Sequence, residues 1–350
     1  MVEGNSASMR SSDVSTFSSD IEPVVEPASS HLWVWILLLI CFYAVWLSVV
    51  TGLGYWSEVT AHWPIALAMA IGSYASGSTP MGGGSVGFPI LALLFDESVT
   101  VGRDFSFAIQ SIGMVSASIF ILARRQVLAW SMLKGAALGT LVGLPVGLLW
   151  VAPSVPEIWA KVSFATILCS FGILHLYRFR EIAEREGFDS RHDVRDYLLG
   201  VATGFVACAT VVSATGVGVD MAIYMILTLL VRADLKVAIP TSVVIMGFAS
   251  LVGLGFTYIT GGIDHGVFGH WTAAAPVVAI GAPLGVYVVS LIGRKPTLLV
   301  VALLCLAQFV WTLSAEWPQL GLTGCLIAIL SVAAVLWAIE WLYHQGKMVR

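Results

Sequence analysis

Charged residues are scarce in this chain: they account for 11% of its 350 residues, less than half of the about 25% that is usual in soluble domains. The formal net charge is −4, so the sequence lacks the excess of basic residues with which proteins bind nucleic acid. Because 58% of the residues are hydrophobic, too little polar surface remains to cover a water-soluble domain. The composition excludes a soluble domain and a nucleic-acid partner.

Patterns that hold metals or disulfides are missing as well. The five cysteines all lie inside apolar runs and none belongs to a CxxC pair, which is typical of small buried apolar residues rather than of disulfides or zinc ligands. The seven histidines show no metal-ligand spacing with one another. The sequence therefore indicates no metal site and no cofactor.

Apolar runs long enough to span a bilayer as helices, which takes about 20 residues, fill the chain from residue 31 nearly to its end. The predicted spans are 32–51, 104–123, 132–151, 160–177, 237–259, 271–292, 297–314 and 320–343. Residues 1–30 are rich in Ser, Glu, Asp and Pro. They are expected to form a disordered tail, because this composition cannot bury a core.

Two broken apolar segments, 64–95 and 197–231, lie among these spans. The first contains the glycine-rich stretch GSTPMGGGSVGFP, and the second contains a weaker counterpart, SATGVGVDMAIY. Glycine and proline interrupt helices at a depth where an unpaired backbone amide costs several kcal/mol. Two broken segments at corresponding places in two halves are typical of secondary transporters, which bind their substrates at the breaks.

Each broken segment would either cross the membrane once or turn back as a hairpin. The arm from Pro64 to Tyr74 forms about 16 Å of helix, roughly half of a hydrocarbon core. Single crossings divide Lys and Arg 9 to 8 between the two sides, whereas hairpins leave only Arg103 and Lys161 on one side, a split of 15 to 2. The positive-inside rule therefore predicts two non-crossing hairpins, with both termini and the charged 178–196 loop in the cytoplasm of an inner-membrane protein.

The two halves align as a repeat: the hairpin glycines Gly82 and Gly218 match, Ser106 and Ser242 match further on, and a GxPxG motif recurs once in each half. Each repeat holds one hairpin and three spanning helices, and three crossings are an odd number. We therefore predict an all-α polytopic membrane protein of two inverted-topology repeats, each a broken re-entrant hairpin plus three transmembrane helices, with flanking N- and C-terminal helices. The predicted division is a tail (1–30), the first helix and an outer loop (31–63), repeat 1 (64–177), a charged loop (178–196), repeat 2 (197–315) and a C-terminal helix with its tail (316–350).

The glycine hairpins, the GxPxG helices (143–147 and 281–285) and the Thr241-Ser242 pair together resemble the TauE/SafE family of membrane anion exporters, over about residues 62 to 315. The resemblance implies a secondary transporter, not an enzyme, that exports sulfite or an organosulfonate such as sulfoacetate across the cytoplasmic membrane, driven by an ion gradient. Another small anion, such as thiosulfate or a carboxylate, stays open, as does a homodimer. The first repeat departs from the family pattern, because Phe105-Ser106 stands where Thr-Ser is typical.

No Lys or Arg lies in the middle of a predicted span, so the anion is expected to bind at the start of each return arm, where free amides and the positive end of the helix dipole lie. Glycine lets an oxyanion approach that backbone, and nearby hydroxyls would donate to it. The alternative is that the small residues only allow close helix packing. The predicted substrate-binding residues are Ser78, Thr79, Gly82, Gly83, Gly84, Ser85, Ser106, Ser213, Thr215, Gly216, Gly218, Thr241 and Ser242.

Asp220 is the one carboxylate predicted within a hairpin. As a structural residue it would cap the return arm. As a functional residue it would carry a proton or bind sodium, and so couple an ion to the substrate. Because a permanent anion would repel an anionic substrate, the coupling role requires a carboxylate that takes up a proton.

Two rival classes are an enzyme and a passive channel. Residues 83–87 fit the G-x-S-x-G pattern of a serine nucleophile, but no strand precedes Ser85, and the nearest candidate base, His175, is predicted at a cytoplasmic helix end. The position that matches Ser85 in the second hairpin is Met221, so the pattern does not favour an enzyme. A passive channel differs from a transporter in that it cannot drive flux uphill.

Overall fold

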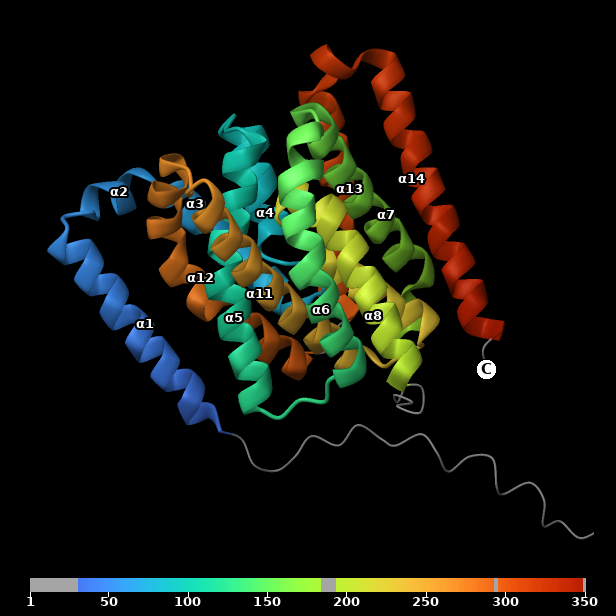
Figure 1. Cartoon of the computed structure of the whole chain (residues 1–350), viewed down its shortest axis with the longest axis horizontal. Helices are drawn as coiled ribbons and strands as arrows, with labels where there is room; N and C mark the ends of the chain where they lie inside the picture. Colours follow the sequence, from blue (N-terminus) through green and yellow to red (C-terminus); the bar gives the residue numbers. More distant parts are fainter. Residues whose placement is uncertain (1–30, 184–192, 293–294, 349–350) are drawn as a thin grey trace, which may run out of the picture.

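The computed structural model describes residues 31–183, 193–292 and 295–348. The predicted tail and residues 184–192 of the predicted charged loop lie outside these residues. The described residues form helices and connecting turns, with no strand (Figure 1). The long helices outside the broken segments are α1 (Leu32–Gly52), α5 (Val99–Ala123), α6 (Trp130–Val146), α7 (Glu157–Ala183), α11 (Leu235–Thr260), α12 (His265–Ile292), α13 (Lys295–Ala315) and α14 (Trp317–Met348).

Within the described ranges, nine helices are long and apolar enough to cross a membrane. Eight of them coincide with the predicted spans to within a few residues at each end, and α6 is continued to Ser154 by the π-helix η2 (Gly147–Val151) and the 3-10 helix η3 (Ala152–Ser154). The ninth covers 193–215, the first arm of the second broken segment. The all-helical polytopic fold is confirmed, whereas the predicted domain boundaries and the inverted relation of the complete halves stay predictions.

Both broken segments are pairs of helices with a break between them. In the first, α3 (Trp63–Ser78) precedes α4 (Gly84–Pro89), which η1 (Ile90–Leu94) continues as a π-helix. In the second, α8, η4 and α9 run without interruption before the break, and α10 and η5 follow it. The bounds are α8 (Asp193–Ala207), η4 (Cys208–Val212), α9 (Ser213–Thr215), α10 (Val219–Met225) and η5 (Ile226–Leu230).

The first arms are longer than the half-helices that the sequence predicts. The arm α3 has 16 residues rather than 11, and residues 193–215 form a continuous helical stretch of 23 residues. The physical reason is tertiary packing, because each first arm lies along a glycine-lined helix of the other half, which keeps it helical past its own small residues.

The first segment enters and leaves at the same end of the helix bundle. The imidazole of His270, at the start of α12, lies edge-on against the ring of His62, with centroids 4.6 Å apart, just before α3 begins. Its Nε2 also lies 3.8 Å from the carboxylate of Glu97, which follows η1. One residue therefore contacts both ends of the segment. This geometry fits the predicted hairpin and not a single crossing.

The second segment also returns to the end at which it starts. Near the start of α6, Ser131 donates to Asp193 at the beginning of α8, at 2.7 Å. At the same end, the amide of Ala129 donates to Thr241, in the second turn of the helix that follows the segment, at 3.0 Å. Since α5 runs from the exit of the first hairpin to the loop before α6, the two hairpins open at opposite ends of the bundle.

This arrangement predicts a labelling result. Cysteines introduced at Glu58 and Asp96 are expected to react with a membrane-impermeant thiol reagent from the same side of the membrane, because both residues lie at the open end of the first hairpin. A cysteine at the exposed Arg125 is expected to react only from the other side. The labelling is measured in whole cells and in inverted vesicles, with the exposed Cys41 replaced by serine. Reaction of the Glu58 and Asp96 cysteines from opposite sides would contradict the hairpin.

The two return arms share local features at a constant sequence spacing. Each ends in a π-helix, η1 or η5. Two residues after each π-helix the backbone turns left-handed at a non-glycine residue, with φ of 55° at Asp96 and 61° at Arg232. The next helix is capped in both halves by a side chain, Ser98 before α5 and Asp234 before α11. These matches are what the predicted repeat requires of the return arms.

Glycines let each first arm approach the helix on which it packs. A Cβ atom at Gly139 of α6 would lie 2.2 Å from the carbonyl oxygen of Val201 in α8, and one at Gly143 would lie 2.5 Å from that of Phe205. In the other half, a Cβ at Gly285 of α12 would lie 2.2 Å from the carbonyl oxygen of Tyr74 in α3. The helix with the GxPxG motif in each half thus packs against the first arm of the hairpin of the other half. Figure 1 shows α6 beside α8.

Candidate functional site

The tips of the two hairpins meet in the buried centre of the bundle. A Cβ at Gly84 would lie 2.4 Å from the side chain of Val217, in the break of the second hairpin, and 2.8 Å from Cβ of Ser106. A Cβ at Gly216 would lie 2.7 Å from the same Ser106 atom. Three of the predicted site residues, one from each hairpin and one from α5, therefore share one contact point.

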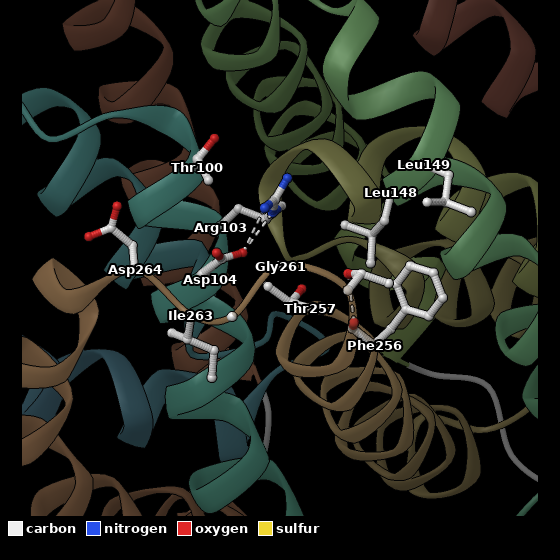
Figure 2. A pocket seen from close by; sticks show the side chains of 12 residues that line it. Thr100, Arg103, Asp104, Leu148, Leu149, Phe256, Thr257, Gly261, Ile263 and Asp264 are labelled. Atoms are coloured by element: carbon white, nitrogen blue, oxygen red, sulfur yellow. Dashed lines mark hydrogen bonds and ion pairs between the residues drawn. The ribbon is translucent and has the colours of Figure 1, made fainter.

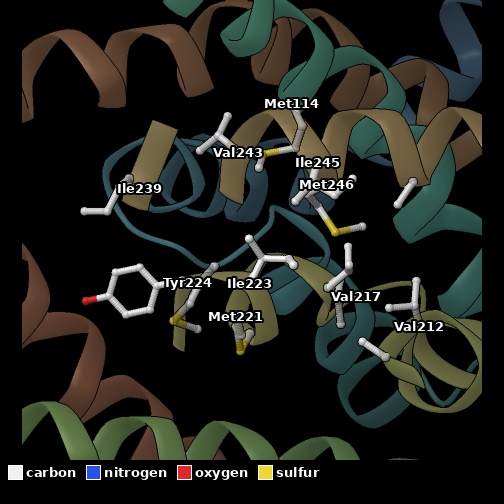
Figure 3. Close-up of a cluster of buried hydrophobic side chains, with 14 of the residues drawn as sticks. Met114, Val212, Val217, Met221, Ile223, Tyr224, Ile239, Val243, Ile245 and Met246 are labelled. Carbon is white, nitrogen blue, oxygen red and sulfur yellow. The ribbon is translucent and has the colours of Figure 1, made fainter. Parts of the chain in front are cut away.

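Glycine is required in the second break for conformational reasons. Gly216 has φ of +79° and Gly218 has φ of +123°, backbone conformations that side chains with a Cβ rarely adopt. The return helix α10 starts directly after Gly218 and packs against α11, and Figure 3 shows Ile223 on the side that faces α11. The break is thus fixed between two glycine turns and a hydrophobic contact.

Gln110 of α5 connects the two breaks, although the sequence analysis does not select it. Its Nε2 donates to the carbonyl oxygens of Ser106 and Gly216, both at 2.9 Å. These two acceptors fix which end of the amide is nitrogen, so Oε1 must point the other way, toward Gly82. Gln110 is 1% exposed, and its Oε1 has no hydrogen-bond partner among the described residues.

Asp220 faces the same point from the second hairpin. A Cβ at Gly82 would lie 2.0 Å from Oε1 of Gln110 and 2.9 Å from Oδ2 of Asp220. The Asp220 side chain is completely buried, and its Oδ1 accepts the amide of Met221 at 2.9 Å, while Oδ2 has no partner among the described residues. Two acceptor oxygens without donors thus converge over one glycine, which is costly unless a proton or another ligand lies between them.

Most of the predicted hydroxyls are occupied. The hydroxyl groups of Ser78, Thr79, Ser106, Ser213, Thr215 and Ser242 all donate to backbone carbonyls of their own helices or breaks. Thr241 donates to Val237 and accepts the amide of Ala129, so it braces α11 against the start of α6. Ser85 differs, because its buried Oγ has no hydrogen-bond partner among the described residues. Among the described hydroxyls predicted at the site, that of Ser85 is therefore the one available to a ligand.

A cavity of about 590 Å³ lies above the tips, at the end where the first hairpin opens (Figure 2). Its lining includes Arg103, Asp104 and Asp264, and Arg103 pairs with Asp104 at 2.8 Å. The carbonyl oxygen of Arg103 lies 2.7 Å from where a Cβ of Gly216 would be. Arg103 therefore lies between the cavity and the hairpin tips.

The structure does not form the pair that a serine enzyme would need. His175 is buried rather than at an exposed helix end; its Nδ1 lies 2.8 Å from the carbonyl oxygen of Phe171 and its Nε2 lies 2.9 Å from the hydroxyl of Tyr224. These contacts use both ring nitrogens, and neither involves Ser85. Lys161, which the sequence places with Arg103 on the outer side, is paired with Glu316 at 2.7 Å.

Comparison with known proteins gives one match. A family model described as sulfite exporter TauE/SafE matches residues 66–312, which covers both hairpins, the helices between them and most of α13. No curated protein and no solved structure matches the chain.

Proposed function

This chain belongs to the TauE/SafE sulfite exporter family of membrane transporters, and from that premise we propose that it exports a small sulfur oxyanion, sulfite or an organosulfonate, across the cytoplasmic membrane and couples the export to an ion gradient. The observation that carries the proposal is the meeting of two hairpin tips at a buried point. There, among the described residues, backbone amides next to glycines and one carboxylate are brought together without a Lys or Arg side chain, and the unpartnered hydroxyl of Ser85 belongs to the first turn of α4.

Such a site suits a small anion that must be released again. Backbone amides and a hydroxyl bind an oxyanion through directed hydrogen bonds, whereas a buried arginine would hold it much more tightly. Arg103 lies one layer above, at the floor of the cavity, where it would meet an anion that enters or leaves. The backbone of Arg103 packs closely on Gly216 between the cavity and the tips, an arrangement that fits one state of an alternating-access cycle.

The orientation in the membrane follows from charge. The end at which the second hairpin opens carries Arg124 and Arg125 after α5 and Arg232 after η5, and α1 begins there, since the amide of His31 donates to the carbonyl of Ala123. We assign this end to the cytoplasm by the positive-inside rule. The cavity of Figure 2 then faces outward.

The test is transport by the purified protein in liposomes. We expect liposomes preloaded with the substrate to accumulate labelled anion from outside by exchange, measured for sulfite, sulfoacetate, thiosulfate, taurine and a small carboxylate in parallel. A sulfur oxyanion should compete best, because its tetrahedral or pyramidal oxygens can accept from both hairpins at once. Exchange with the carboxylate alone would mean that the substrate is a carboxylate and not a sulfur oxyanion. Downhill flux without exchange would favour a channel.

A further inference from the structure

The carboxylate of Asp220 lies where the amides of the two breaks converge. The amide of Met221 donates to its Oδ1, and the backbone amides of Gly82 and Gly218 face the same carboxylate. These amides come from both hairpins, and they are the groups that the proposed substrate would use. A side-chain anion therefore lies in the place that a free anion is expected to fill.

Gln110 provides the second half of the observation. Its amide is fixed by two carbonyl acceptors, so Oε1 can only accept a hydrogen bond, and it faces Oδ2 of Asp220 across Gly82. When Asp220 is ionised, the amides of Met221, Gly82 and Gly218 serve its carboxylate, but Oε1 of Gln110 has no donor and faces a second acceptor. A protonated Asp220 would donate to Oε1 and satisfy both oxygens.

We propose that Asp220 is a proton-controlled occupant of the anion site. When ionised, its carboxylate holds the amides of Gly82, Gly218 and Met221 and competes with the substrate. When protonated, Asp220 becomes a donor to Gln110 and leaves those amides to the substrate. One proton from the solution then joins Oδ2 for each anion bound and leaves again when the anion does. This inference rests on the proposed function. It assigns Gln110 as the residue that accepts a hydrogen bond from the protonated Asp220.

In the part of the chain that the structure describes, no charged side chain pairs with Asp220 and so would fix it in one state. From η4, the thiol of Cys208 faces the carboxylate, and that thiol is bound to Thr140 at 3.4 Å. Tyr224, one turn further along α10, bonds with His175. In the layer above, Arg103 is paired with Asp104. Among the described residues, the carboxylate faces the backbone amides of both breaks, and Oε1 of Gln110 lies on the other side of the same Gly82 position.

The experiment measures proton uptake when an anion binds to the full-length purified protein. Thiosulfate and sulfoacetate serve as probes, because both keep a constant charge between about pH 6 and pH 9. Calorimetry in buffers of different ionisation enthalpy is expected to show about one proton taken up per anion at high pH, and the affinity is expected to fall by up to tenfold per pH unit as pH rises. An affinity that does not change with pH, without proton uptake, would overturn the proposal in the unmodified protein.

Two variants separate this site from other carboxylates. Asp220→Asn cannot ionise, so it is expected to bind the probes with no proton uptake and, in liposomes, to exchange anions while losing the response to an imposed pH gradient. Asp264→Asn removes a carboxylate of the cavity and is expected to keep the proton uptake. If Asp220→Asn retains the pH slope, Asp220 is only a helix cap. If neither probe binds to either protein at any pH, the proposed function fails and this inference with it.

Discussion

Replacing Gly139 by valine is expected to prevent folding of the protein. In α6, the first added carbon atom would lie 2.2 Å from the carbonyl oxygen of Val201 and 2.6 Å from the backbone nitrogen of Phe205. Both are backbone atoms of α8 and cannot move aside as a side-chain end would. The glycines one turn before and one turn after, Gly135 and Gly143, are equally close to α8, so the helix cannot shift along the groove. We expect a destabilisation above about 4 kcal/mol.

The measurement is the yield of monodisperse protein in detergent by fluorescence-detected gel filtration, together with the thermal unfolding midpoint. The matched control is Gly255→Val in α11, where an added Cβ would have nothing within 4 Å. The control changes the same residue types within a long helix, so it is expected to keep the yield of the unmodified protein. A normal yield of Gly139→Val would mean that contact with α6 is not what holds the second hairpin in place.

The spans could be predicted from the sequence because bilayer crossing depends on length and hydropathy, which are properties of each segment alone. The hairpins could be predicted because Lys and Arg are concentrated in the loops on one side of the membrane. The contacts of His270 with both ends of the first hairpin agree with this prediction. The length of the first arms could not be predicted from the sequence. The small residues that end the apolar pattern near Tyr74 remain helical because they lie against α12, and this packing depends on the partner helix.

The candidate site shows the same division. Glycines and Asp220 stand out in the sequence because they are unusual at membrane depth, and the structure brings Gly82 and Asp220 to one point. Gln110 has no such signal beyond being a single amide in an apolar helix, and its role depends on where Gly216 lies in the fold. Most of the predicted hydroxyls donate to the carbonyl three or four residues earlier, as a Ser or Thr in a helix usually does, so their part in binding stays a prediction.

Transport is expected to fall on the order of 100-fold in Gly82→Ala, while the protein still folds. The added methyl group would lie 2.0 Å from Oε1 of Gln110 and 2.9 Å from Oδ2 of Asp220. Both atoms are ends of side chains, so they can turn away at modest cost, unlike the backbone atoms beside Gly139. Gln110 would then lose its bond to Gly216, and the methyl group would fill the point where the two hairpins and the substrate are proposed to meet.

A glycine outside the predicted site provides the control. A Cβ at Gly255 of α11 would have no atom within 4 Å. Gly255→Ala is therefore expected to transport within about twofold of the unmodified protein, since it adds the same atom without touching Gln110 or Asp220. Both variants are measured by anion exchange in liposomes at equal amounts of folded protein. Equal exchange by the two variants would place the anion path elsewhere, and loss of folded Gly82→Ala protein would mean that the glycines serve packing alone.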